Sequence, residues 1–234
     1  MTYRPDFSKA YIVANEILVT SKVIDKFPFS TTKLIKEFSD LSIHSFSRAR
    51  SLGINPNDLG SKSALISRKQ GKYILFFNDN HLKTRIKFSL LHEFGHFLLG
   101  HEFTDITDEI YNKQEVEANF FAAQILMPKQ LIDELRKREV IITERFLIEK
   151  FGVSKIASQK RLEHINKVSE YRKKNEEVYY DDIILKKYEG FMNSIKGKAE
   201  TFESCYEKEL ERQSWFYWIN IIKNTKSLNL LLEQ

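Results

Sequence analysis

The chain holds few residues that cross-link or interrupt a fold: one cysteine, four prolines and eight glycines among 234 residues. The lone Cys205 excludes an internal disulfide and is too few for a thiolate metal site, which fits a reducing compartment. No run of about 18 apolar residues exists, and the apolar stretch at 215–222 is far too short to span a bilayer. Residues 1–6 lack the features of a signal peptide. We therefore expect a cytoplasmic protein without membrane contact.

Charge of one sign is also scarce, since the net charge is only +5 and the pI is about 9.0. Such a mild excess is compatible with an acidic partner, DNA included, but is more often the mark of a basic face on a soluble protein. Hydrophobic residues make up 42% and charged residues 29% of the chain, an ordinary globular balance. The length allows one domain with a sizeable core and an appendage.

The hydrophobic periodicity predicts an α+β fold, with helices around a small antiparallel sheet. Residues 64–66 and 73–77 flank the turn 69–72 as the strands of a hairpin do. A helical period then covers 82–99, where Gly100 is placed to end the helix. The other expected elements are a strand at 41–44 and helices at 7–20, after Ser30, at 112–127, 131–137, 144–151 and 154–168.

Charge and helix-breaking residues suggest three parts. Pro128 stops the helix before it, and the chain becomes strongly charged from Ser169 onward. We predict a core domain at 1–128, a helix-turn-helix-like extension at 129–170, and a helical C-terminal appendage of unknown role at 171–234.

The segment His92-Glu93-Phe94-Gly95-His96 has the pattern H-E-x-x-H. Two histidines four residues apart lie on one face of a helix, where both imidazoles can bind one zinc ion. Glu93 is offset by about 100° around the helix and can act as the general base for a metal-activated water. Gly95 would let another element approach closely. The alternative is a pair of structural histidines on a helix face.

A catalytic zinc site needs a third protein ligand. The metzincin pattern is absent, because Leu99 and Glu102 occupy its glycine and histidine positions. The alternative ligand is Glu115, with Asn119 on the same helix face to orient a ligand as an outer-shell partner. Glu117, about 200° from Glu115 around that helix, is expected to face solvent.

Two ambiguities remain around these residues. Asn112 and Glu115 are spaced as in a capping box, so Glu115 could cap a helix instead of binding metal. The donor that stabilises the transition-state oxyanion is also open, with Tyr73, Tyr111 and His101 as candidates. We expect His101 to be mainly a helix-end residue that interacts with the dipole.

Two segments carry a family resemblance. Residues 85–96 resemble the R-x-x-F-[ST]-x-x-H-E-[LIF]-G-H signature of the ImmA/IrrE metallopeptidases, and residues 115–128 resemble that family's second signature. The resemblance covers about 10–168. It implies a zincin-like core, Zn²⁺ bound by His92, His96 and Glu115, Glu93 as catalytic base, and action on helix-turn-helix repressors of mobile elements or stress genes.

Residues 146–162 have the outline helix, turn, helix, with Ser154 as N-cap of the second helix. A DNA-reading helix would present Lys155, Gln159, Lys160 and Arg161. We favour the alternative, a packing element or a grip for the substrate, because nearby glutamates dilute the basic charge.

These observations predict a zinc endopeptidase of narrow specificity that cleaves a helix-turn-helix repressor, without direct DNA binding. One rival is a non-proteolytic DNA- or protein-binding regulator that keeps zinc for structure. Another is the regulatory arm of a toxin or phage system, in which binding the partner matters more than cutting it. Glu93 argues against a structural site, which has no use for a base.

Overall fold

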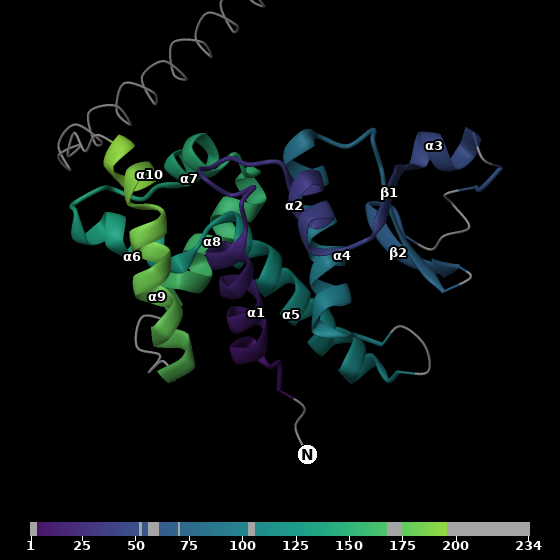
Figure 1. Cartoon of the computed structure of the whole chain (residues 1–234), viewed down its shortest axis with the longest axis horizontal. Helices are drawn as coiled ribbons and strands as arrows, with labels where there is room; N and C mark the ends of the chain where they lie inside the picture. The colour runs from purple at the N-terminus through teal and green to yellow at the C-terminus, as the bar shows by residue number, and fades with distance from the viewer. Residues whose placement is uncertain are drawn as a thin grey trace, which may run out of the picture.

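The computed structural model describes residues 4–51, 53–55, 61–69, 71–102, 106–167 and 175–195. These residues form an α+β fold, as expected, with a small sheet at one end and a group of helices at the other (Figure 1). The elements in chain order are α1 (Phe7–Thr20), α2 (Thr31–Phe38), β1 (Ser42–Ser45), α3 (Phe46–Ser51), β2 (Ala64–Lys69), β3 (Lys72–Phe77), α4 (Lys83–Leu99), α5 (Asp108–Leu126), α6 (Lys129–Lys137), α7 (Glu144–Phe151), α8 (Lys155–Lys167), α9 (Asn175–Lys187) and α10 (Glu189–Ser194). No helix in this part of the chain is long and apolar enough to cross a membrane.

The sheet has the strand order β1-β3-β2. The hairpin of β2 and β3 is antiparallel, as predicted, and turns at Gly71 with a φ of 78°, a conformation that favours glycine. β1 instead pairs parallel to β3, with Ser42 opposite Ile74. The expectation of an antiparallel sheet is therefore wrong for this pair. The hairpin reverses the chain between β2 and β3 and places β3 between β1 and β2, so that β3 runs in the same direction as β1.

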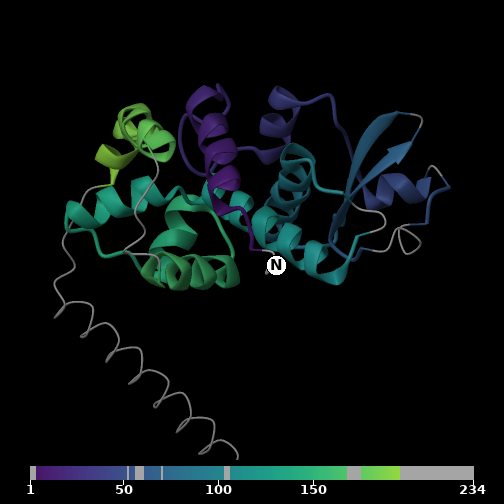
Figure 2. The ribbon, with the colours of Figure 1, turned by 90° about the horizontal axis from the view of Figure 1, so that it is seen from below.

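One hydrophobic cluster links the helices. It includes Leu18 of α1, Leu91 of α4, Phe121 of α5, Leu147 of α7 and Tyr188 at the end of α9, all almost fully buried. α1 packs on α4 and α5 on one side and on α9 on the other, as Figures 1 and 2 show. The predicted boundaries near 128 and 170 fall between α5 and α6 and between α8 and α9. The division into three domains stays a prediction, and residues 196–234 of the appendage lie outside the described residues.

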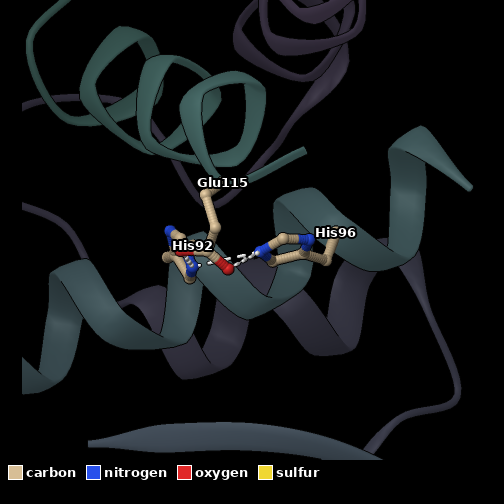
Figure 3. A group of neighbouring side chains, drawn as sticks. All are labelled: His92, His96 and Glu115. Atoms are coloured by element: carbon tan, nitrogen blue, oxygen red, sulfur yellow. Dashed lines mark hydrogen bonds and ion pairs between the residues drawn. The ribbon is translucent and has the colours of Figure 1, made fainter. Parts of the chain in front are cut away.

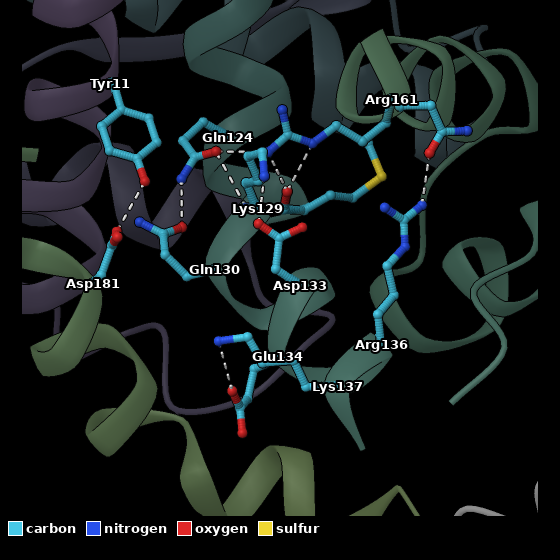
Figure 4. Close-up of polar contacts among 12 residues, drawn as sticks. Tyr11, Gln124, Lys129, Gln130, Asp133, Glu134, Arg136, Lys137, Arg161 and Asp181 are labelled. Carbon is cyan, nitrogen blue, oxygen red and sulfur yellow. Dashed lines mark hydrogen bonds and ion pairs between the residues drawn. The ribbon is translucent and has the colours of Figure 1, made fainter. Parts of the chain in front are cut away.

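A buried polar network joins the helices after Pro128 to the rest (Figure 4). Arg161 of α8 is fully buried and donates to the Met127 carbonyl oxygen, at 3.0 Å from Nε, and to Gln124 Oε1, at 2.6 Å. Gln124 in turn donates to Asn15 of α1 and to Gln130. Arg161 therefore holds the end of α5 in place.

The helix-turn-helix outline is present in α7 and α8. Gly152 ends α7 with a φ of 65°, and Ser154 Oγ accepts from the Ala157 N–H at 3.2 Å. Of the residues named for a DNA-reading helix, Arg161 is inside the protein and cannot reach a phosphate. Lys155 and Lys160 are exposed. The contacts of Arg161 with Met127 and Gln124 show that α8 packs against the end of α5, as the packing interpretation of this segment expects.

Candidate metal and catalytic site

Helix α4 carries the H-E-x-x-H segment along its contact with α5. One side of α4 is buried in the core and carries Leu90, Leu91 and Phe94. Gly95 lets α5 approach, because a Cβ built at Gly95 would lie 2.8 Å from Cδ1 of Phe121. α4 ends at Gly100, whose φ of 68° is left-handed and whose N–H closes the last turn onto His96 and Phe97. The sequence thus brings two helices unusually close at the level of the histidines.

His92, His96 and Glu115 converge on one point between α4 and α5 (Figure 3). The Nε2 atoms of the histidines are 3.1 Å apart. The Glu115 carboxylate lies 3.4 Å from Nε2 of His92 and 3.3 Å from Nε2 of His96. One ligand atom from each residue lies within 4.8 Å of the others, so the cluster could hold a metal ion. Two imidazoles and one carboxylate are a donor set that suits catalytic zinc.

Glu115 is not a helix cap. α5 begins at Asp108, after Thr107, whose Oγ1 accepts from the Ile110 N–H at 3.4 Å. Asn112 therefore lies inside the helix, and the capping-box interpretation is wrong. The facing imidazoles of His92 and His96 hold the pKa of Glu115 well below its usual range. The carboxyl is thus ionised where a cation would need it.

Asn119 contacts a histidine, one of the two partners considered for it. Its side-chain Oδ1 lies 3.1 Å from Nδ1 of His92. An amide oxygen can only accept, so the Nδ1–H of His92 donates to it, and Nε2 is the ring nitrogen that faces the cluster.

Glu93 lies beside the cluster and is largely buried. Burial raises its pKa to about 7, with the Glu115 charge acting in the same direction, while His92 and a backbone hydrogen bond from Ile66 oppose the rise. A carboxyl whose pKa lies near neutrality can both accept and return a proton at the working pH. This is the property that a general base needs.

His101 and Glu117 occupy places that the sequence reasoning missed. Glu117 was expected to face solvent, but its side chain is 7% exposed. The far side of α5 is covered by the start of α1, and Glu117 accepts the N–H of Asp6. His101 is more than a helix-end residue: it contacts both His96 and Glu117. Burial lowers its pKa to about 4, so it is neutral at pH 7.

The three candidates for oxyanion stabilisation lie in different places. Tyr111 is one turn before Glu115 on the exposed side of α5, and the nearby Glu115 charge raises its pKa. Tyr73 packs edge-on against Phe97, with ring centroids 5.2 Å apart. His101 lies behind His96. Tyr111 is therefore the best placed of the three to meet a substrate, and its role stays a prediction.

Two histidines one turn apart, a carboxylate from a second helix and a buried carboxyl beside them form the arrangement of a metal-dependent hydrolase site. Residues 42–163, more than half of the chain, match the family described as the IrrE N-terminal-like domain, Peptidase_M78. The chain therefore belongs to this family, which implies a function of the metallopeptidase type and confirms the resemblance seen in the sequence. The matched segment contains all of α4 and α5. No curated protein matches the chain.

Proposed function

We propose that this protein is a cytoplasmic zinc-dependent endopeptidase of narrow specificity. The observation that carries the proposal is the convergence of His92, His96 and Glu115 beside the partly buried Glu93. Bound zinc would polarise the scissile carbonyl and make water a nucleophile near neutral pH. A structural zinc site is usually closed by four protein ligands. Among the described residues only three ligating side chains gather here, which favours an open, catalytic site.

The protein side chains divide the remaining work. Glu93, in its ionised form, accepts the proton of the attacking water and later gives it to the leaving amine. Asn119 orients His92 through Nδ1, and Glu115 supplies a negative charge from the facing helix. The Tyr111 hydroxyl, on the open side of Glu115, is our choice for a hydrogen bond to the oxyanion.

The sheet supports a peptide as the substrate. β2 is an edge strand, with β3 on one side and no strand among the described residues on the other. The backbone of Ile66 in β2 lies near enough to Glu93 to lower its pKa, so this edge of β2 faces the catalytic carboxyl. An extended peptide could pair with this edge by main-chain hydrogen bonds and lie across the site. Because only an extended segment can pair in this way, folded partners would be cut at few places.

The substrate that we propose is a helix-turn-helix repressor, a choice that rests on the family resemblance alone. The test is co-expression of the wild type or Glu93→Gln with candidate repressors, followed by mass spectrometry of fragments. Zinc content is measured on the same samples. We expect Glu93→Gln to keep zinc and the partner but to lose cleavage by about 10²-fold or more. Glu163→Gln, which removes an exposed carboxylate of α8, is the matched control and should cleave normally.

Equal effects of wild type and Glu93→Gln on the partner would favour the rival function, a regulator that binds without cutting. Absence of zinc from the purified wild type after supply of the metal would contradict the metal assignment itself.

A further inference from the structure

His96 is the first member of a chain of three side chains that leads away from the metal cluster. Its Nδ1 lies 2.8 Å from Nδ1 of His101. Nε2 of His101 lies 2.9 Å from Oε2 of Glu117. The side chains of His101 and Glu117 are only 5% and 7% exposed, so little water competes for these contacts. The chain thus runs from a candidate ligand to a buried carboxylate.

The proton positions in this chain follow one from another. A carboxylate accepts only, so Nε2 of His101 must carry the proton that faces Glu117. A neutral imidazole has one N–H, which leaves Nδ1 of His101 as an acceptor. Nδ1 of His96 must then be the donor in the bond between the two rings. Its Nε2 is left with a lone pair, and this is the atom that faces His92 and Glu115.

The fold holds each member of the chain in place. The left-handed Gly100 turns the chain back, so that the N–H of His101 bonds to the His96 carbonyl oxygen at 3.0 Å. This turn sets the two rings edge to face, with centroids 4.9 Å apart. Glu117 is fixed by the Asp6 N–H and by Lys113, whose Nζ lies 3.6 Å from Oε1. Together with His101 on Oε2, these contacts hold both carboxylate oxygens in place.

We propose that His101 and Glu117 are positioning residues that lock His96 in the tautomer and ring orientation required of a metal ligand. The inference rests on the proposed zinc site and deepens it. It also explains why two ligands on one helix have different partners: His92 is oriented by the amide of Asn119, and His96 by an imidazole backed by a carboxylate. Outer partners of metal-binding histidines commonly fix the ring in this way.

The test uses the full chain and two substitutions of His101. His101→Phe keeps an aromatic ring but removes the acceptor, whereas His101→Asn can offer its amide oxygen near the place of Nδ1. We expect His101→Phe to weaken zinc binding by about 10- to 100-fold, measured by competition with a chromophoric chelator. His101→Asn should recover most of the loss. His44→Phe, on β1, is the matched control and should bind zinc as the wild type does.

A second measurement needs no metal. The ¹⁵N spectrum of His96 reports which ring nitrogen carries the proton. In the metal-free wild type we expect the Nδ1–H tautomer, and in His101→Phe a substantial population of the Nε2–H tautomer. A packing role alone would not move this signal. Should His101→Phe fail to fold, Glu117→Leu and the wild-type spectrum still test the assignment.

The inference is overturned if His101→Phe binds zinc like the wild type, or if metal-free wild-type His96 is protonated at Nε2. Failure of the wild type to bind zinc would sink the proposed function instead. The tautomer of His96 would still report on the chain of three side chains.

Discussion

Two polar clusters inside this protein differ in their balance of donors and acceptors. Around Arg161, a guanidinium donates to the oxygens of Met127 and Gln124, so each of these bonds pairs a donor with an acceptor. Around His92, His96 and Glu115, the Nε2 atoms of two imidazoles and a carboxylate face one another. These three groups offer more acceptors than donors, as the ligands of a metal site do. This imbalance, more than the presence of polar residues, distinguishes a candidate site from a structural network.

The largest effect on stability is expected in the cluster around Arg161. Arg161→Met should lower the free energy of unfolding by about 3–5 kcal/mol, since it strips charged hydrogen bonds from a fully buried carbonyl and amide. Burial lowers the pKa of Arg161 only to about 10, so the cation is present at neutral pH. Chemical denaturation of metal-free protein measures the loss. A decrease below about 1 kcal/mol would show that the network contributes little.

Glu115→Ala is the corresponding change in the cluster of His92, His96 and Glu115. Here we expect a large loss of zinc affinity and a small loss of stability. Zinc affinity should fall by more than the ~10- to 100-fold expected for an outer partner. Stability without metal should change by about 1 kcal/mol or less, because the site is partly exposed. Chelator competition and denaturation report the two quantities. If Glu117→Leu lowers zinc affinity more than Glu115→Ala does, then Glu117 is the metal ligand and Glu115 the outer partner.

The third prediction concerns Glu93 and pH in the metal-free protein. The pKa of its carboxyl rises from 4.5 to about 7 on folding. Between these values the unfolded chain loses the proton while the folded protein keeps it, so wild-type stability falls as pH rises through this window. Glu93→Gln does not titrate. It should therefore be more stable than the wild type by about 2–3 kcal/mol at pH 8, with the difference vanishing near pH 4.

Denaturation curves at several pH values between 4 and 8 measure this difference. A difference that is constant over the range would mean that Glu93 is solvated rather than buried. The result would make the site resemble an ordinary surface cluster.

The smallest effect is expected at the turn that brings His101 behind His96. Gly100→Ala places a Cβ at a φ of 68°, and nothing lies within 4 Å of that Cβ. The cost is therefore backbone strain alone, about 1 kcal/mol of stability. Thermal unfolding measures it. A loss of several kcal/mol would mean that the turn carries more of the fold than its contacts indicate.

Local patterns could be predicted from the sequence, and long-range contacts could not. The spacing of His92 and His96, the hairpin and the end of α4 at Gly100 each depend on a few neighbouring residues. The burial of Glu117 depends on the start of α1, more than a hundred residues away in the chain. Helical periodicity places Glu117 opposite Glu115 but does not say what covers that side. The parallel pairing of β1 was missed for the same reason.

The contacts of α1 determine how short a working form of this protein can be. The Asp6 N–H holds Glu117, and Lys9 Nζ donates to the carbonyl oxygen of Leu99 at 2.6 Å, where α4 ends. Both contacts come from residues ahead of the segment 42–163 that matches the family. A truncated chain that starts at residue 42 would keep every proposed ligand. It would lose the contacts from Asp6 and Lys9 that hold Glu117 and the end of α4 in place. We therefore expect the shortest active fragment to include the first helix.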